Sequence, residues 1–474
     1  MIAYSFPPEG NAGAYRPLRF VRQLPKLGWM PTVISAIPSE YERHDPQLLR
    51  MVPDDVEVIR IRAHDLWQAL QARRSKRVQE LATSTEREHL GNRQNGQQSS
   101  FRAWLREKVR TAEASWYQPD MAMPWIARAV DAAVKVCQRN LIDVIWATAG
   151  PVSSFLVAQK SSARTGIPYV LDFRDAWTIT FNQFEAGRPE WAKRLARRAM
   201  HQLLNGAQAV IFRYDTEAEC FWRAYRGALD TSRIYIIPNG YESPIEQFAP
   251  PTGNKCTIVY AGTLPDYRYD TLLESLDVLK NTDPSRAKQL RLCFVGEGMD
   301  VLADDAAALG LSDIVETAGP KPYAEITRLQ QEAHALLVLG RPPTMQGYEL
   351  FVGAKLFGYL KAGRPIIGVL PQDETKQILQ SVGVRTVADV DSVSEITTVL
   401  REVVDNWSKG TLSLLAPDQK ACETYSSERQ TAVLVRALEG VPAEKPFVPG
   451  SQGIPPSLRE TIEKDDWLED ADWK

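Results

Sequence analysis

The stretch Pro250-Pro-Thr-Gly-Asn254-Lys-Cys256-Thr-Ile-Val-Tyr-Ala261 joins a run of turn formers to a short apolar run. An apolar run of this length, bounded by turn formers, is typical of a buried strand. Together with the turn-forming Pro238-Asn-Gly240, it marks residues 238–255 as a linker. On both sides of this linker, short apolar runs alternate with helical patterns, which indicates parallel sheets with crossover helices. The sequence therefore predicts an α/β fold with two Rossmann-like, doubly wound domains.

The first domain is expected over residues 1–237 and the second over 256–426. Strand candidates are 2–6, 32–36, 56–61, 144–147, 169–173, 209–212 and 234–237 in the first domain, and 256–261, 290–295, 314–317, 335–339 and 365–370 in the second. A helix is expected after Gly13, with Pro17 near its first turn and Gly28 as its terminator. The run 2–6 is short, so either the start codon lies upstream or the strand is trimmed.

An insert over residues 64–119 does not belong to either sheet, and its part 71–110 carries ten basic and four acidic residues. A tryptophan-bearing apolar stripe and an arginine stripe recur at helical spacing over 101–116, the latter formed by Arg102, Arg106 and Arg110. Such a helix can lie on an anionic membrane surface. The alternative, which we favour, is a helix packed on the first domain with a solvated basic face.

Two further segments follow the second domain. Residues 427–440 form a helical pattern that is expected to pack back across the domains. Residues 441–474 are rich in Pro and Gly and then acidic, which predicts a disordered tail.

Composition excludes several classes of protein. With 474 residues, 56 Lys and Arg balance 59 Asp and Glu, so there is no basic field for nucleic acid. Five cysteines without a Cys-x-x-Cys pair speak against a disulfide framework, and five dispersed histidines speak against a metal site. No secretory signal and no apolar run long enough to span a membrane are visible. The sequence predicts a cytoplasmic protein without a bound metal.

The loop after the first apolar run is a candidate anion site. Gly10 and Gly13 would let backbone N–H groups approach a phosphate at the start of the following helix. The alternative is that they only permit a tight turn. No third glycine completes a dinucleotide fingerprint, so a dehydrogenase is weakly supported.

A second candidate anion site opens the second domain. Gly262 ends the first strand there, Thr263 follows it, and Arg268 stands on the next turn. A glycine, a hydroxyl and a cation in this order suit a diphosphate. The alternative for Arg268 is a solvated surface arginine. Gly296 and Gly298 end the next strand in the same way and are a weak signal.

Lys355 is the most informative cation. The run Gly353-Ala-Lys355-Leu-Phe-Gly358-Tyr-Leu-Lys-Ala-Gly363-Arg-Pro365 predicts a helix that starts near Lys355 and stops at Gly363. A cation at a helix N-terminus opposes the helix dipole and is costly unless an anion compensates it. The alternative is a lysine whose stem lies on the surface with its amine in water.

Five motifs in one order resemble glycosyltransferase family 4. They are Phe6-Pro-Pro-Glu-Gly-Asn-Ala-Gly-Ala-Tyr-Arg16, Leu171-Asp-Phe-Arg-Asp-Ala-Trp177, Ile237-Pro-Asn-Gly240, Val259-Tyr-Ala-Gly262 and Lys355-Leu-Phe-Gly-Tyr-Leu-Lys-Ala-Gly-Arg-Pro365. The resemblance covers residues 1–62 and 120–440. It implies the GT-B fold, with two Rossmann-like domains facing a central cleft. It also implies transfer of a sugar from a nucleoside-diphosphate donor, with retention of configuration and without metal or cofactor.

The same resemblance suggests roles for individual residues. Gly10 and Gly13 correspond to the family's loop facing the donor phosphates and acceptor. Arg174 and Asp175, the predicted catalytic residues, stand where many members have a His-Asp pair. Arginine stays protonated and cannot act as a base, so an electrostatic role is expected for Arg174. The alternative is that Asp172, Arg174 and Asp175 form an ion-pair cluster at a strand end.

In the second domain, Gly262, Thr263, Arg268 and Lys355 are the expected nucleotide-sugar contacts. Thr263 stands where the family commonly has a phosphate-binding Arg, and Arg268 stands at the spacing of its Lys. The main departure is Gly358, where many members have the Glu that binds the donor ribose. That residue's usual partner falls on Leu350, with Glu349 out of register by one, so neither carboxylate is in place.

The resulting prediction is a retaining, metal-independent hexosyltransferase-type enzyme of polysaccharide or glycoconjugate biosynthesis. Its partners would be a nucleotide sugar and a saccharide or lipid-linked saccharide, with peripheral contact to the inner membrane face left open. Two alternatives remain: a GT-B protein that binds a nucleotide sugar or a partner without turnover, and a sugar-nucleotide epimerase. The epimerase is disfavoured because no carboxylate and histidine set is evident among the candidates.

Overall fold

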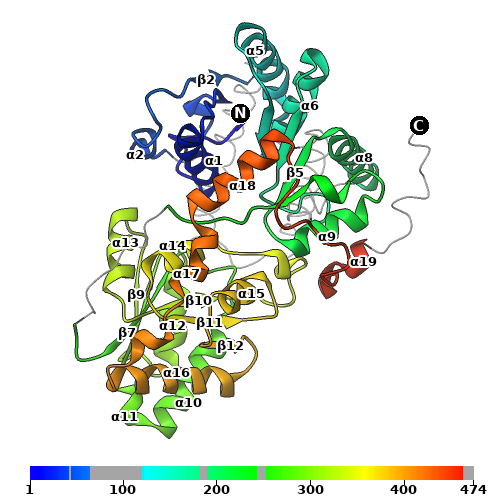
Figure 1. Cartoon of the computed structure of the whole chain (residues 1–474). Coiled ribbons are helices and arrows are strands. Elements are labelled where there is room, and N and C mark those ends of the chain that lie inside the picture. Colours follow the sequence, from blue (N-terminus) through cyan, green and yellow to red (C-terminus); the bar gives the residue numbers. More distant parts are fainter. Residues whose placement is uncertain (42–43, 64–119, 121, 181–188, 243–251, 463–474) are drawn as a thin grey trace, which may run out of the picture. The chain divides into compact units, whose positions relative to one another are not determined.

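The computed structural model describes residues 1–41, 44–63, 120, 122–180, 189–242 and 252–462. These residues form two compact units (Figure 1). Among the described residues, the N-terminal unit comprises Met1–Ile237 and Thr431–Gln452, and the C-terminal unit comprises Pro238–Gln430 and residues 453–462. The basic insert over 64–119, with its expected helix, lies outside the described residues.

The N-terminal unit is built on parallel strands. In spatial order they are β2 (Val58–Ile61), β1 (Val33–Ala36), β3 (Ile145–Thr148), β4 (Tyr169–Asp172), β5 (Ala209–Phe212) and β6 (Ile234–Ile236). Between β1 and β3 the run 2–6 forms only two isolated bridges, in which Ile2 pairs with Ile34 and with Ala147. The run bends after Tyr4 and meets Pro7, and proline cannot donate to a ladder, so the pairing stops early.

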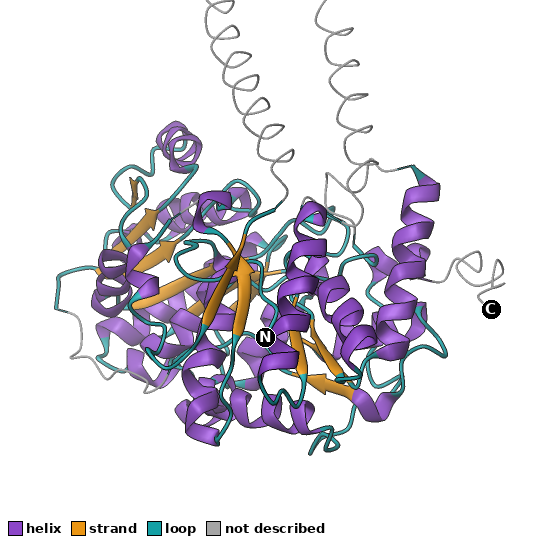
Figure 2. Cartoon of the chain, turned by 90° about the horizontal axis from the view of Figure 1, so that it is seen from above, coloured by secondary structure: helices purple, strands orange, loops and turns teal. Residues whose placement is uncertain are grey.

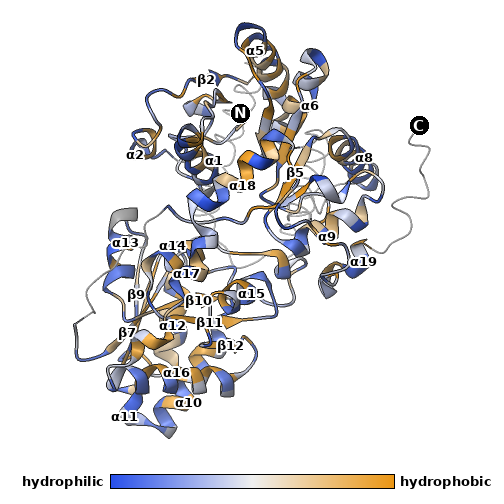
Figure 3. Ribbon diagram, in the orientation of Figure 1, coloured by the Kyte–Doolittle hydropathy of each residue, from blue (hydrophilic) through white to orange (hydrophobic). Residues whose placement is uncertain are grey.

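Helices flank this sheet (Figure 2). They are α1 (Ala12–Gln23), η1 (Leu24–Leu27), η2 (Pro38–Glu40), α2 (Pro46–Leu49), η3 (Met123–Trp125), α5 (Ile126–Arg139), α6 (Ser153–Thr165), α8 (Glu190–Gly206), α9 (Asp215–Ala224) and η4 (Thr231–Arg233). The predicted stop at Gly28 is confirmed, since this residue caps η1 in the left-handed region with φ 81°. Figure 3 shows hydrophobic colour along β5 and hydrophilic colour on the surface of α8.

Helix α18 (Ser427–Glu439) brings a late part of the chain into the N-terminal unit, to which residues from Thr431 on belong. Its buried Leu434, Ala437 and Leu438 join Phe20 and Trp146 in one hydrophobic cluster. The helical pattern expected over 427–440 is therefore present, and its apolar face completes the core of this unit.

The C-terminal unit holds a six-stranded parallel sheet. Its spatial order is β12 (Val387–Asp389), β11 (Ile366–Leu370), β10 (Ala335–Leu339), β7 (Cys256–Ala261), β8 (Leu290–Val295) and β9 (Val315–Ala318). The helical segments are α10 (Asp270–Thr282), α11 (Pro284–Ala287), α12 (Met299–Ala308), α13 (Tyr323–Glu332), η5 (Tyr348–Leu350), α14 (Lys355–Ala362), α15 (Glu374–Ser381), α16 (Val393–Ser408), η6 (Leu412–Leu415), α17 (Gln419–Cys422), η7 (Glu423–Tyr425), η8 (Pro456–Leu458) and α19 (Arg459–Ile462). Strands and helices alternate as the sequence predicts, and only the short β12 was not expected.

The segment after residue 440 differs from the sequence-based expectation of a disordered tail. Up to Ile462 it has a defined path, and η8 and α19 belong to the C-terminal unit. The buried side chains of Leu458 and Ile462 account for this, because they give a Pro-rich segment apolar anchors. Residues 463–474 lie outside the described residues.

One buried ion pair joins two of the sequence motifs within the N-terminal unit. The Arg16 guanidinium donates from Nε and Nη2 to the Asp172 carboxylate, the latter at 2.7 Å, and both side chains are almost fully buried. Nη2 also donates to the Ile237 carbonyl at 2.9 Å. This pair ties α1 to the ends of β4 and β6.

We expect Asp172→Leu to lower the free energy of unfolding of this unit by about 3–5 kcal/mol, because it leaves the Arg16 cation buried and unpaired. Denaturant unfolding followed by tryptophan fluorescence measures this loss. The double variant Arg16→Met/Asp172→Leu should recover most of it, since it removes both charges. If the free energy of unfolding of Asp172→Leu lay within about 1 kcal/mol of the native value, the assignment of this buried ion pair would be contradicted.

Candidate functional site

Each predicted site residue follows the carboxyl end of a parallel strand or begins a helix next to one. Ligands of doubly wound sheets bind at that edge, where loops and helix N-termini converge.

In the N-terminal unit, Arg174 follows β4 and is held by backbone carbonyls. Its Nη1 donates to the Gly13 carbonyl, and its Nη2 donates to the Gly150 carbonyl at 3.2 Å. Burial lowers the pKa of this guanidinium from its ordinary value, although the neighbouring Asp175 opposes the shift. An arginine remains a cation even so, and two of its donors are already committed here.

Pro17 explains why a carbonyl of α1 is available to Arg174. A helical residue normally donates its N–H to the carbonyl four positions earlier, which for residue 17 is that of Gly13. Proline lacks this N–H, so the Gly13 carbonyl has no helical partner at this point. The Arg174 guanidinium supplies the missing donor.

Two glycines make room for the guanidinium. A Cβ on Gly150, whose φ is +83°, would lie 2.1 Å from Arg174 Nη2, and a Cβ on Gly13 would lie 3.0 Å from the same atom. Gly10 is different, because a Cβ there would make only ordinary contact with Asp45 at 3.4 Å. The structure thus brings Gly13 and Arg174 together, whereas Gly10 lies against His44 and Asp45, just before α2.

Asp172, the last residue of β4, and Asp175 form no direct ion pair with Arg174, although the charges of both oppose the lowering of its pKa. Asp172 is committed to Arg16, while Asp175 is exposed at the strand end. The hydrogen bonds of Arg174 go to carbonyls, so Asp175 interacts with it through charge alone. Asp175 remains a predicted catalytic residue with an accessible carboxylate.

In the C-terminal unit, the ends of β7 and β8 approach each other through glycine backbone. Gly262 has φ +143° and Gly296 has φ +146°, and a Cβ on Gly296 would lie 2.1 Å from the Gly262 carbonyl oxygen. The Gly262 N–H already donates to the Val295 carbonyl at 2.9 Å. Gly262 therefore supplies space at this edge and not a free N–H group.

The side chain of Lys355 occupies the space beside Gly262. Lys355 is the first residue of α14, and a Cβ on Gly262 would lie 2.9 Å from its Nζ. Nζ donates to Tyr260 Oη at 2.6 Å and lies 3.8 Å from the Tyr260 ring centroid and 4.3 Å from that of Tyr267. The described residues place no carboxylate in an ion pair with it. We call Tyr260 and Tyr267 the tyrosine cage of Lys355.

The cage changes the acid–base state of the lysine. Burial lowers the pKa of Lys355 to about 7, because aromatic rings replace water around the ammonium group. Its amine is therefore only partly protonated at neutral pH. An anion placed beside it would favour the charged form.

A small cavity of about 10 Å³ lies beside Lys355 and is also lined by Arg341, Phe351 and Asp373. The Arg341 guanidinium stacks 3.5 Å from the Phe351 ring centroid. The Asp373 carboxylate accepts the Lys376 N–H at 2.8 Å and caps α15, and burial raises its pKa to about 8. The cavity has room for about one water molecule, so a larger ligand would have to lie outside it, next to these side chains.

Thr263 and Arg268 lie further out. Thr263 is exposed, and its carbonyl accepts from Tyr260 Oη at 2.8 Å. The Arg268 guanidinium donates to Asp270 at 3.0 Å and also to Asp391. Arg268 is therefore neutralised by two carboxylates in this structure, and a phosphate would have to compete with them.

The structure also describes positions 350 and 358, where the two carboxylates of the family are missing. Leu350 is buried, and Glu349 beside it is 5% exposed and bonded to Ser457. Gly358 is the fourth of the eight residues of α14, and a Cβ there would meet only Gln330 Oε1 at 3.8 Å. Space thus exists for a side chain at position 358.

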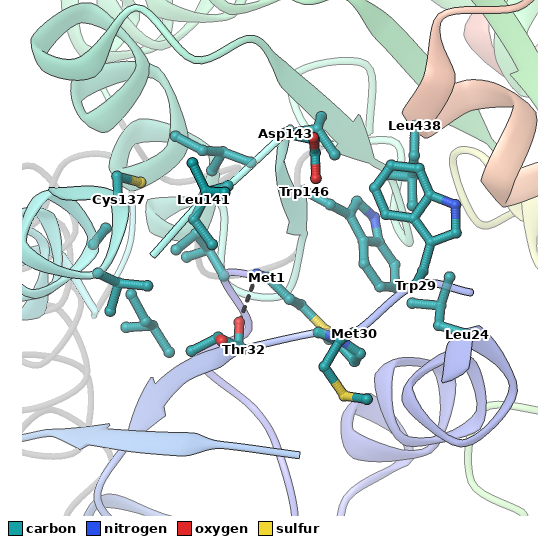
Figure 4. A pocket seen from close by; sticks show the side chains of 18 of the residues that line it. Met1, Leu24, Trp29, Met30, Thr32, Cys137, Leu141, Asp143, Trp146 and Leu438 are labelled. Carbon is teal, nitrogen blue, oxygen red and sulfur yellow. Dashed lines mark hydrogen bonds between the residues drawn. The ribbon is translucent and has the colours of Figure 1, made fainter. Parts of the chain in front are cut away.

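A far larger cavity lies at the other edge of the N-terminal sheet. It has a volume of about 710 Å³ and is lined by residues that precede β1 and β3, including Met1, Thr32 and Leu141 (Figure 4). The Met1 nitrogen donates to the Thr32 carbonyl there at 2.8 Å. Because it opens at the amino ends of the strands, this cavity is not part of the edge that carries Gly13 and Arg174.

Two features of this site were not predicted from the sequence. The sequence did not indicate the tyrosine cage, because tyrosines in or beside an apolar run are ordinarily expected to be core residues. The partnership of Arg16 with Asp172 could have been suspected, because both stand in the quoted motifs and charged residues inside a strand end need partners. In the described part of the chain, no group of His, Cys, Asp or Glu is arranged to hold a metal ion.

Comparison with known proteins agrees with the architecture. HepE from Anabaena in complex with UDP and glucose is 13% identical, with a TM-score of 0.55 over 93% of this chain and 98% of that chain. Sucrose-phosphate synthase from Thermosynechococcus elongatus is 12% identical, with a TM-score of 0.55 over 91% of this chain and 93% of that chain. At these identities the likeness shows the fold.

A family model adds to the structural likeness. Residues 12–240 match the model of the glycosyl transferase 4-like domain. No curated protein matches the chain in a sequence search. The chain therefore has the GT-B type of fold, and the match of residues 12–240 to the model of the glycosyl transferase 4-like domain confirms the resemblance that the motif order predicts.

Proposed function

We propose that the protein is a retaining, metal-independent glycosyltransferase that moves a hexosyl unit from a nucleoside-diphosphate sugar to an acceptor hydroxyl. The match of residues 12–240 to a glycosyl transferase 4-like domain is the observation that carries this proposal. The caged Lys355 supports it from the C-terminal unit, as a cation at a helix start without an ion-pair partner in the described residues. The bound UDP and glucose of the HepE structure are consistent with such a donor.

The proposed reaction is a displacement on one face of the sugar. The bond between the anomeric carbon and the diphosphate oxygen breaks, and the acceptor oxygen bonds to the anomeric carbon on the same face. The acceptor proton passes to the departing phosphate, so no protein base is required. Lys355 and the first-turn N–H groups of α14 would bind the diphosphate, with Arg268 as a second cation. Arg174 would act electrostatically, with Asp175 beside it.

The acceptor in this proposal is a saccharide or a lipid-linked saccharide, as in polysaccharide or glycoconjugate assembly. Among the helices of the described residues, none is long and apolar enough to cross a membrane. We propose a cytoplasmic enzyme, for which peripheral contact with a membrane would bring it to a lipid-linked acceptor.

A second candidate function is binding of a nucleotide sugar without turnover. Leu350 and Gly358 favour it, because neither can accept hydrogen bonds from sugar or ribose hydroxyls through its side chain. Incubating the protein with UDP-, GDP- and ADP-sugars and measuring hydrolysis and transfer separates the two. Release of a nucleoside diphosphate supports the transferase, whereas saturable binding without release over long incubation supports the alternative.

We expect Lys355→Ala to weaken binding of UDP by about tenfold or more, the loss of one charge-assisted contact. Calorimetric titration measures this change. Lys288→Ala, an exposed lysine at the amino edge of the same sheet, is the control and should bind as the native protein does. Equal affinities of all three proteins would remove Lys355 from the site.

Binding of UDP should depend on pH through Lys355. Its cation is present below a pKa of about 7 and is lost above it, so affinity should fall by up to about tenfold per pH unit on the alkaline side. Asp373 becomes an anion above about pH 8 and would weaken binding further.

Titrations between pH 7 and 9 measure this profile. Lys355→Arg keeps its charge throughout and should flatten the fall between pH 7 and 8. A native profile as flat as that of the arginine variant would show that the amine is fully charged in the free protein.

Gly358→Glu tests whether a missing carboxylate limits donor use. The site has space for the side chain, so we expect tighter donor binding or faster turnover. Glutamate or alanine in place of Gly358 should also stabilise α14, by up to about 1 kcal/mol. Gly358→Ala is the matched control, because it gains helix stability without a carboxylate. Weaker donor binding in the folded Glu variant than in the Ala variant would show that another group fills this space.

A further inference from the structure

We propose that the carboxyl-terminal segment 454–462 is a positioning element of the donor site, in which Ser457 clamps Glu349 and thereby fixes the loop 346–353 beside Lys355. This inference rests on the proposed function for its ligand and on the C-terminal unit alone for its geometry. We call residues 454–462 the strap and residues 346–353 the clamped loop.

Four hydrogen bonds join the strap to the clamped loop. Ser457 donates from its backbone N–H to Glu349 Oε1 at 3.0 Å and from Oγ to Glu349 Oε2. Ser457 Oγ also accepts the Gly347 N–H at 2.9 Å. Gln346 Nε2 donates to Thr461 Oγ1 at 2.7 Å. Ser457 thus engages both oxygens of one carboxylate and the backbone beside it.

Burial makes this arrangement costly to break. Glu349 is 5% exposed, and a buried carboxylate is tolerated only when hydrogen bonds replace its water. Ser457 supplies two such bonds, and bonds to a charged acceptor are stronger than bonds between neutral groups. Leu458, which is fully buried, anchors the strap independently of the serine hydroxyl. The anchor and the clamp are therefore separable by mutation.

The clamped loop leads from Glu349 directly to the lysine site. Phe351 lies two residues beyond Glu349, and its carbonyl accepts from Thr375 Oγ1 at 3.2 Å. The Phe351 ring stacks under Arg341 and meets the Tyr267 ring edge-on at a centroid distance of 6.1 Å. Tyr267 is one wall of the cage around Lys355. A displacement of the clamped loop would therefore move groups that surround the amine.

The serine clamp also explains why Glu349 is unavailable for another task. Both of its oxygens are committed to Ser457, so this carboxylate does not replace those missing at Leu350 and Gly358. Its contribution to the site is indirect and passes through the loop that it holds. Ser457 and Glu349 are therefore positioning residues.

Ser457→Ala is the decisive variant, because it removes the hydroxyl bonds and leaves Leu458 in place. Mutations along a contact chain of this kind modulate binding at its far end severalfold, so we expect about three- to tenfold weaker UDP binding. Glu349→Gln should give a similar loss. Ser457→Thr keeps the hydroxyl and should restore most of the affinity. The control is Ser408→Ala, which removes one hydrogen bond to Gln289 at the amino edge of the sheet.

A second measurement does not depend on any ligand. Labelling of amines at a series of pH values, read by mass spectrometry at Lys355, gives the midpoint of its titration in the ligand-free protein. Loosening the cage admits water, so Ser457→Ala should raise this midpoint toward the ordinary lysine value. A merely structural strap would lower the melting temperature and leave the midpoint unchanged.

The outcomes distinguish the strap from the proposed function. If native protein does not bind UDP, the donor assignment fails, and the Lys355 midpoint alone decides the strap. An unchanged midpoint together with unchanged UDP affinity in Ser457→Ala would overturn the proposal. Tighter UDP binding in that variant would also overturn it, because the strap would then be blocking the site.

Discussion

In each unit a cation occupies the space that the Cβ of a glycine would fill. Arg174 lies against Gly150 in the N-terminal unit, and Lys355 lies against Gly262 in the C-terminal unit. Both glycines follow a strand of a parallel sheet and have a positive φ, which a residue with a Cβ rarely adopts. The close approach fixes where each cation can sit, and the neighbouring loops are arranged around it. Any side chain at these two positions would displace the charge from the edge of the sheet.

The two cations are desolvated by different surroundings, and the difference has chemical consequences. Arg174 exchanges water for carbonyl oxygens, which are good acceptors, so its charge is stabilised in place. Lys355 exchanges water for two aromatic rings and one hydroxyl, which compensate an ammonium group less well. Only the lysine therefore changes protonation near neutral pH, and only it gains charge when an anion arrives.

Local patterns predicted most of the fold and the position of the cations. The alternating apolar runs predicted eleven of the twelve strands in the described residues, and the stop at Gly363 with Lys355 at the helix start was confirmed. The contacts that shape the site join residues far apart in the chain, and a single sequence does not reveal them. The tyrosine cage joins α14 to residues nearly one hundred positions earlier, and the clamp joins Glu349 to Ser457 across a similar separation. The composition of residues 441–474 predicted a disordered tail, because composition alone does not show the packing that buries Leu458.

The absence of carboxylates at Leu350 and Gly358 changes the electrostatic balance of the lysine site. A carboxylate near a diphosphate repels it, and this repulsion must be offset by hydrogen bonds from the hydroxyl groups of the donor to the carboxylate. Here the nearby acids are restrained: Glu349 is bonded on both oxygens by Ser457, and burial keeps Asp373 largely protonated at neutral pH. The site is therefore less acidic than one with two free glutamates. Its affinity for a nucleotide would come mainly from the phosphates, and its selectivity for the sugar would have to come from backbone and neutral side chains.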